Sequence, residues 1–374
     1  MDYDLLSSYA GLLSLATASI YFGAHGSLPP PRNADGSRNE EAEAEELPDR
    51  LSSGDAYLFP IIGSATLVGM YAVVVYFGTG WINWLLGHYL AIVGVGAVWK
   101  TLIGLARYAL GPTRWKSFDL LALVIRRGSG DPTKRARPPL VDLSLRTPSL
   151  LLLPLALLPS ALYTFHARTA LLTDILALAM AHNALGLIKL DSFATGCILL
   201  TGLFFYDIWW VFGTEVMVKV ATSLDVPIKL VWPKSLPFVG GGGRGYTMLG
   251  LGDVVIPGVF VALALRYDHH RATSASGPVR GTTSSTFGKP YFYAALGAYV
   301  AGLVTTMGVM HLFGKAQPAL LYLSPACMGA FGITGAVRGE LGAAWGWSDE
   351  ADEDEGKADE KKADESAPVG PEAE

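Results

Sequence analysis

The sequence predicts an all-α membrane protein. About half (51%) of the 374 residues are hydrophobic and only 16% are charged, whereas about a quarter of residues are charged in soluble domains. The apolar residues are collected into long stretches, each about long enough to cross a ~30 Å hydrocarbon core as a helix of roughly 20 residues. These stretches are too long for strands and lack the alternation of a β-barrel. The expected fold is therefore a bundle of membrane-spanning helices.

Nine such stretches follow one another along the chain. The first begins after two acidic residues, Asp2 and Asp4. Because a secretory signal peptide begins with basic residues, this stretch is interpreted as a membrane span. The predicted spans cover residues 5–23, 57–78, 82–103, 148–166, 169–189, 193–214, 246–267, 290–313 and 317–337.

The polar segments differ in composition. Residues 25–56 contain three consecutive prolines and an acidic Glu/Ala tract, residues 268–288 are rich in Ser, Thr and Gly, and residues 341–374 hold mostly Asp, Glu, Lys and Ala. None of the three can bury enough apolar area to fold alone, so all three are expected to be disordered. The expected organisation is a membrane domain over residues 1–340, followed by an acidic tail over residues 341–374.

The basic residues predict the orientation in the membrane. When the polar segments are numbered alternately, about 21 of the 28 Lys and Arg residues fall in the set that includes residues 104–147 and the C-terminal tail. Only about 6 fall in the opposite set. The positive-inside rule places the first set in the cytosol. The N-terminus is then expected to be lumenal or extracellular, and the C-terminus cytosolic.

Two acidic residues stand out within predicted spans, where a charged side chain costs about 2.5–3.5 kcal/mol even on the lenient insertion scale. Asp207 lies in the sixth span and Asp253 in the seventh. Each is about seven residues from the end of its span on the same side of the membrane. At 1.5 Å per residue, both lie roughly 10 Å below the same face. Consecutive antiparallel helices would therefore bring the two carboxyl groups side by side.

Two carboxyl groups in a low-dielectric site cannot both ionise easily, so one keeps its proton while the other is charged. The charged group can deprotonate a water held between them, and the neutral group can donate a hydrogen bond to a scissile carbonyl. This is the chemistry of an aspartic protease, and it requires neither a metal nor a cofactor. Because the pair titrates together, neither acid has a fixed role.

Several neighbours suit such a site. Gly250 and Gly252, on either side of Leu251, remove side chains beside Asp253 and allow another backbone to come close. Tyr206 precedes the first acid. It either forms a hydrogen bond near the site or packs at the membrane interface, and the sequence favours neither.

A further candidate is the segment Gln317–Pro318–Ala319–Leu320 at the start of the last span. Pro318 removes a backbone donor and disfavours helix, so the segment offers free backbone groups that can pair with an unwound substrate as a strand. The alternative is a proline near the first turn of an ordinary helix.

Two more polar residues lie in the fifth predicted span. Asp174 is close to the end of that span, so a solvated role at the interface is expected. Asn183 is deeper and is interpreted as a hydrogen-bonding contact between helices rather than a catalyst.

Three motifs together resemble the signal peptide peptidase family, the relatives of presenilin that are intramembrane aspartyl proteases. They are Tyr206–Asp207, Gly250–Leu251–Gly252–Asp253 and Pro318–Ala319–Leu320, which occur in this order in the sixth, seventh and ninth spans. The resemblance covers nearly all of spans two to nine. It implies a nine-transmembrane-helix bundle of the presenilin/signal-peptide-peptidase type, with Asp207 and Asp253 as the catalytic pair.

The resemblance also implies substrates, partners and location. The substrates would be signal peptide remnants and other type II membrane helices. The partners would be membrane lipid and a homo-oligomer or membrane quality-control complex, with no nucleic acid. The location would be the endoplasmic reticulum. The chain departs from the family pattern because it lacks a terminal dilysine signal, since Lys361–Lys362 lies too far from the end.

Two other functions use the same features. A proton- or cation-coupled transporter or channel can relay ions through membrane-embedded acids, but it predicts repeated halves, and the sequence shows no such internal repeat. A non-catalytic protein that binds membrane helices would function without either acid.

Overall fold

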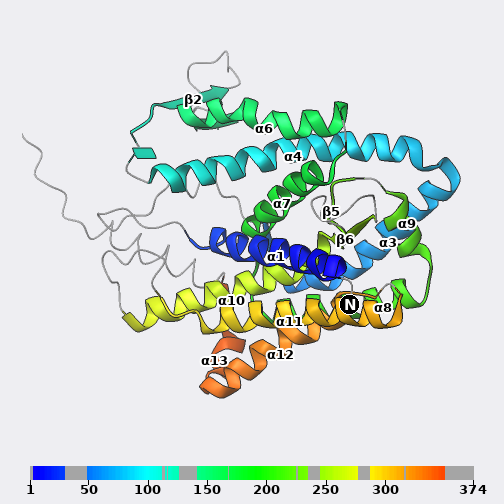
Figure 1. Ribbon diagram of the computed structural model, residues 1–374. Coiled ribbons are helices and arrows are strands. Elements are labelled where there is room, and N and C mark those ends of the chain that lie inside the picture. Colours follow the sequence, from blue (N-terminus) through cyan, green and yellow to red (C-terminus); the bar gives the residue numbers. More distant parts are fainter. Residues whose placement is uncertain are drawn as a thin grey trace, which may run out of the picture.

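The computed structural model describes residues 3–29, 49–111, 114–115, 117–125, 141–166, 168–224, 226–234, 245–276, 287–315 and 317–349. Over these residues the chain is a bundle of long helices with three small two-stranded sheets (Figure 1). Eight of the described helices are long and apolar enough to cross a membrane. This confirms an all-α multi-pass membrane protein.

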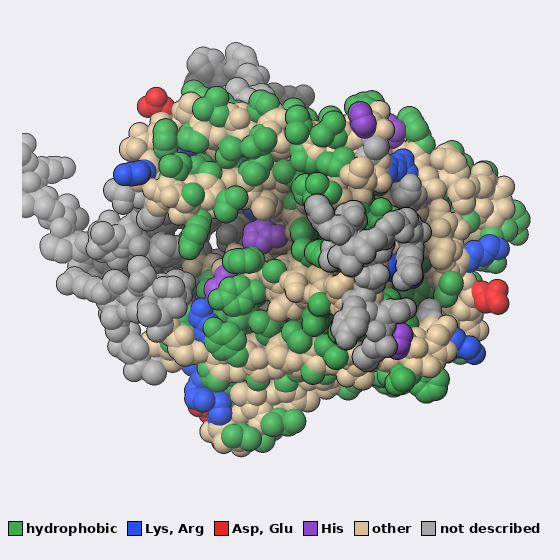
Figure 2. All heavy atoms as spheres, viewed as in Figure 1, with side chains coloured by type: hydrophobic (Ala, Val, Ile, Leu, Met, Phe, Trp, Pro, Cys, Tyr) green, Lys and Arg blue, Asp and Glu red, His purple; other side chains and the backbone are tan. Residues whose placement is uncertain are grey.

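The eight helices correspond to eight of the nine predicted spans. Many of their apolar side chains point outward, as expected of a surface that faces lipid; Leu151, for example, is 75% exposed. Figure 2 shows apolar side chains over most of one face and most of the charged side chains near its two ends. The helices are α1 (Tyr3–Gly26), α3 (Ser53–Phe77), α4 (Thr79–Leu110), α6 (Thr147–Phe165), α7 (Ala170–Leu187), α8 (Phe193–Phe212), α11 (Pro290–Phe313) and α12 (Leu320–Arg338).

The predicted span over residues 246–267 was wrong at both ends. Its first residues form strand β6 (Tyr246–Gly250), which pairs antiparallel with β5 (Lys229–Pro233). The helix that follows, α10 (Gly252–Ser276), begins only at the second glycine of the motif. It is not one of the eight helices that meet the criteria for a membrane span.

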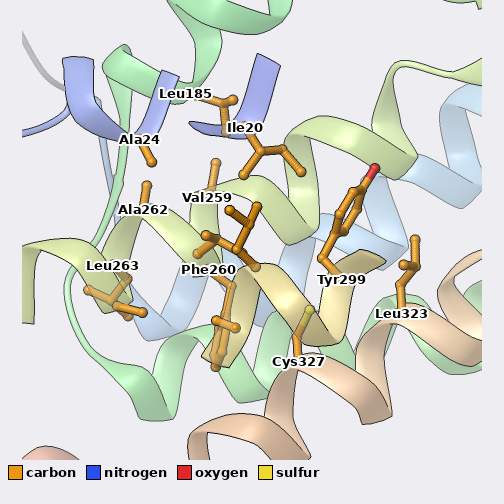
Figure 3. Packing of buried hydrophobic residues seen from close by; sticks show 14 of the residues in the cluster. Ile20, Ala24, Leu185, Val259, Phe260, Ala262, Leu263, Tyr299, Leu323 and Cys327 are labelled. Carbon is orange, nitrogen blue, oxygen red and sulfur yellow. The ribbon is translucent and has the colours of Figure 1, made fainter. Parts of the chain in front are cut away.

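Although helix α10 is less apolar than the eight spans, it can lie inside the bundle because other helices surround it. It packs against α1, α7, α8, α11 and α12, and its residues 259–265 are almost completely buried (Figure 3). Two glycines allow this close packing: a Cβ on Gly196 of α8 would lie 2.7 Å from Phe260, and one on Gly258 would lie 2.7 Å from Leu185 of α7. Apolar contacts on every side thus hold this helix in the centre.

The far end of α10 is held by polar contacts. The buried Arg266 donates to the Asp349 carboxylate (3.1 Å) and to the Leu190 carbonyl (3.1 Å). Asp349 in turn donates its backbone N–H to the Asp191 carbonyl at 2.8 Å. Because a buried cation requires such partners, the chain that supplies Asp349 is folded against the bundle.

Two boundaries expected from the sequence differ in the structure. The segment 268–288 was expected to be disordered, but α10 continues through its first part to Ser276. The tail was expected from residue 341, but helix α13 (Leu341–Gly346) and the residues up to Asp349 are folded on the bundle. The rest of the predicted tail, 350–374, lies outside the described residues.

The remaining elements connect the spans. Strand β1 (Asp49–Leu51), which falls within the predicted disordered loop 25–56, pairs in parallel with β4 (Ile188–Leu190). In the basic segment 104–147, β2 (Leu120–Ile125) and β3 (Val141–Arg146) form an antiparallel pair. The short helix α9 (Val216–Ser223) follows α8 and packs against α3.

Asn183 connects two spans, as expected from the sequence. Its side-chain amide on α7 donates to the Ala97 carbonyl (2.9 Å) and the Thr101 hydroxyl (3.0 Å) of α4. In a membrane, where helices gain little from hydrophobic association with one another, such contacts help to fix the packing of two helices.

Replacing Asn183 should therefore weaken the bundle without removing a functional group. We expect Asn183→Leu to lower the free energy of unfolding by about 0.6 kcal/mol, and by no more than about 1.7 kcal/mol. Thermal unfolding in detergent measures this effect. Leu151→Ala, at an outward-facing position of α6, is the control and should change stability less; equal effects of the two variants would contradict the interpretation.

Candidate active site

Asp207 lies near the end of α8, and its side chain is only 2% exposed. Its carboxylate accepts a hydrogen bond of 3.0 Å from the backbone N–H of Leu320, the first residue of α12. The first N–H groups of a helix have no partner within the helix, and the helix N-terminus favours negative charge. Asp207 therefore serves as the cap of a helix distant in the sequence.

Asp253 is also at a helix N-terminus. It lies in the first turn of α10, and the Val254 and Val255 N–H groups that follow it bond to the Leu251 carbonyl. Four residues later, Pro257 lacks the N–H that would normally bond to the Asp253 carbonyl oxygen. The residue thus combines a partly buried carboxyl group with a backbone carbonyl that has no partner within the helix.

Asp253 lies on α10, which packs against α8, and the charge of Asp207 on α8 acts on its carboxyl group. The sequence predicted this pairing from equal depths of the two acids in their helices, and the predicted depth of Asp253 was wrong. Asp253 does not lie seven residues inside a helix, because residues 246–250 are strand. Instead, an extended segment leads into the site, and the acid follows it directly.

The two glycines of the motif have different surroundings. A Cβ on Gly250 would lie 3.3 Å from Oδ2 of Asp253, whereas a Cβ on Gly252 would meet only Ile256, at 4.0 Å. Between them, Leu251 donates its N–H to the Ile228 carbonyl and extends the pairing with β5. Only Gly250 is therefore required to leave space for the carboxyl group.

Tyr206 packs against α3. Gly63 leaves room for its ring, since a Cβ there would lie 3.6 Å from the tyrosine. On the other side its ring centroid is 6.3 Å from that of Trp210, whose indole N–H donates to Ser64 of α3 at 3.0 Å. These contacts favour the packing interpretation of Tyr206.

The segment Gln317–Leu320 is not an ordinary first helical turn. Helix α11 ends at Phe313 and α12 begins at Leu320, so Pro318 and Ala319 precede the helix. Pro318, Ala319 and Leu320 are all buried, and Gln317 accepts a 3.3 Å hydrogen bond from the Tyr322 hydroxyl. The structure thus brings this segment to Asp207, with Leu320 supplying the contact.

Asp174 has a different role from the expected solvated one. Its carboxylate on α7 accepts a 2.7 Å hydrogen bond from the backbone N–H of Val231 in β5. Antiparallel pairing leaves alternate N–H groups of a strand pointing away from its partner. Asp174 satisfies one of these groups and fixes the outer edge of β5 to the bundle.

The outer edge of strand β6 has no comparable hydrogen-bond partner among the described residues. The backbone hydrogen bonds from Leu251 to Ile228 and from Lys234 to Gly245 show which residue pairs of the hairpin are hydrogen-bonded to each other. By the alternation of an antiparallel pair, residues 247 and 249 direct their backbone N–H and C=O groups toward β5. Residues 246, 248 and 250 point theirs the other way, where the described residues supply no third strand. An open strand edge among the described residues therefore lies directly before the Gly250–Asp253 motif.

Sequence reasoning missed this hairpin. The alternating burial of Tyr246–Gly250 and the β-branched and aromatic residues of β5 are typical of strands. The strand pattern of residues 246–250 was concealed because these residues run directly into the apolar stretch of α10.

Comparison with known proteins decides the family. The family model described as signal peptide peptidase matches residues 41–351. The chain belongs to the signal peptide peptidase family. The human signal peptide peptidase is 37% identical over 340 residues, which cover 89% of this chain and 81% of the human protein. The mouse signal peptide peptidase is 35% identical over 93% of this chain and 84% of the mouse protein.

A yeast relative extends the comparison. A probable intramembrane protease of Schizosaccharomyces pombe is 32% identical over 92% of this chain and 95% of the yeast protein. Members of the signal peptide peptidase family are intramembrane proteases, and the eight apolar helices of this member agree with that class.

The different surroundings of the two motif glycines lead to a test. Gly250→Ala places a methyl group against the Asp253 carboxyl and should lower kcat for peptide cleavage about tenfold, since even an ångström of misplacement can cost about a hundredfold. Gly252→Ala is the matched control and should cost less. Cleavage of a synthetic hydrophobic peptide in detergent measures both; an equal or larger loss in the control would contradict the geometry.

Proposed function

We propose that the chain is an intramembrane aspartyl endopeptidase with Asp207 and Asp253 as its catalytic pair. The observation that carries the proposal is the position of these two acids on packed helices, α8 and α10, of a membrane bundle, where the charge of Asp207 acts on Asp253. The bond from Leu320 to Asp207 supports it, because that bond fixes one acid in place.

The reaction follows from two acids that share one proton. The ionised carboxyl group removes a proton from a water, and the resulting hydroxide attacks the scissile carbonyl carbon. The protonated carboxyl group donates to the carbonyl oxygen. When the intermediate collapses, a proton passes to the leaving nitrogen and the peptide bond breaks. The acid that donated to the carbonyl oxygen takes a proton back from the diol, which restores the shared proton. Because water rather than a side chain attacks, no covalent bond to the enzyme forms.

The substrate must be unwound before it is cut, because helical carbonyl groups are hydrogen-bonded and shielded. The open edge of β6 offers backbone groups to such a segment, in the manner of strand addition. A strand added there would lie beside Gly250, next to Asp253. This arrangement supports membrane-helix substrates such as signal peptide remnants and type II segments.

The proposal includes a location and an orientation. The signal peptide peptidase relatives and the distribution of basic residues support the endoplasmic reticulum, with a lumenal N-terminus and a cytosolic C-terminus. Both acids then lie nearer the lumenal ends of their helices, by the alternation of the spans.

Neutralising either acid should abolish cleavage. Asp207→Asn and Asp253→Asn keep the shape of the side chains but cannot supply the base, so we expect kcat to fall by at least about 10³-fold. Purified protein in detergent and a synthetic hydrophobic peptide provide the assay. Asp174→Asn is the control, since its amide oxygen can still accept from Val231. Substantial cleavage by either catalytic-pair variant would reject the proposal.

The open strand edge gives a second test. Met248 points its N–H away from β5, so Met248→Pro removes a donor that the hairpin does not use, and proline is tolerated on edge strands. We expect cleavage to fall about tenfold or more, because one substrate hydrogen bond is lost and the ring obstructs the edge.

Met248→Ala is the control for the lost side chain and should remain close to wild type. Binding of a transition-state mimic of aspartic proteases distinguishes an obstructed edge from a damaged site. If the proline variant cleaves the peptide at the wild-type rate, the strand-addition step is wrong.

A further inference from the structure

Tyr299 lies in the middle of α11 and is fully buried, with 0% of the residue exposed. Its hydroxyl group has no hydrogen-bond partner among the described residues. Leaving a buried polar group unpaired costs about 1–3 kcal/mol, and such groups are uncommon in native proteins. A phenylalanine would fill the same space without this cost, so the hydroxyl requires an explanation other than packing.

The surroundings of Tyr299 indicate what its hydroxyl serves. Helix α11 packs against both α10 and α12, and Figure 3 shows the Tyr299 hydroxyl pointing away from Cys327. The phenol interacts electrostatically with Asp253 of α10 and with the Cys327 thiol of α12. The charge of Asp207 on α8 also acts on Asp253. These are the titratable groups that the packed elements bring to this tyrosine and its acid.

The two acids differ in their hydrogen bonds. Asp207 accepts from the Leu320 backbone N–H, whereas the described residues supply no hydrogen bond to the Asp253 carboxyl group. An unpaired donor on α11 is therefore coupled electrostatically to a carboxyl group of the packed helix α10 that has no donor among the described residues. In enzymes without substrate, catalytic hydrogen bonds are often long and tighten only when the substrate binds.

We propose that Tyr299 is a positioning residue of the active site, whose hydroxyl donates a hydrogen bond to the Asp253 carboxylate when substrate is bound. This inference rests on the proposed function, since it presupposes that Asp253 is catalytic. The bond holds the carboxyl group against the water and favours its ionised form. Each acid then has one fixed donor: a backbone N–H for Asp207 and a phenol for Asp253.

The test is Tyr299→Phe in the full-length protein in detergent, with a synthetic hydrophobic peptide that the wild type cleaves. Without the donor, the ionised carboxylate is less favoured, so the acid limb of the kcat profile should move to higher pH by about one unit. At a fixed pH on that limb, kcat falls about tenfold. KM should remain unchanged, because the hydroxyl does not touch the substrate.

Tyr291→Phe is the matched control. Tyr291 is equally buried in the same helix, but its hydroxyl donates to Glu340 at 3.5 Å, away from the acids. This control should leave the pH profile in place. Thermal unfolding of both variants separates an effect on the site from an effect on stability.

Each outcome decides between the two proposals. A shifted acid limb in Tyr299→Phe alone supports the positioning role. An unshifted profile, or the same shift in both tyrosine variants, overturns it even if Asp253→Asn is inactive. If Asp253→Asn still cleaves the peptide, the proposed function fails first, whatever the tyrosine variants do.

Discussion

The hydrogen bond from the Leu320 backbone to Asp207 is the contact on which the arrangement of the site depends. It connects the end of α8 to the start of α12, 113 residues apart in the chain. The bond forms because Pro318 delays the helix, which leaves the N–H of Leu320 at a helix terminus without an intrahelical partner. A carboxylate can thus be held deep in the bundle without a cationic partner.

Much of this site could be predicted from the sequence, because carboxyl groups are costly inside a membrane. Asp207 and Asp253 stand out against apolar neighbours, and the fold class follows from the length of the apolar stretches. The interhelical role of Asn183 could also be predicted, since an amide side chain within a span commonly forms a hydrogen bond to a neighbouring helix. The sequence left two interpretations of the proline-containing segment open, and its contact with Asp207 could not be foreseen.

The other features depend on tertiary contacts that hydropathy does not report. Strand β6 was assigned to a span because apolar residues can form a buried strand or a helix with equal ease. The role of Asp174 depends on β5, which arrives from 57 residues away. The end of the folded chain at Asp349 depends on Arg266, a residue that becomes buried only when α10 is enclosed. Tyr299 resembles any other aromatic residue of a span until its neighbours are known.

The open edge of β6 also bears on how a hydrolase can work inside a bilayer. Backbone groups that face hydrocarbon without partners cost several kcal/mol each, so irregular or unpaired backbone at membrane depth must line a hydrated space. The exposed groups at 246, 248 and 250 therefore require solvent whenever no peptide occupies the edge. Because Gly250 lies against the Asp253 carboxyl group, solvent required at this edge would also reach that acid, so the strand that receives a peptide would also supply the water that hydrolysis consumes.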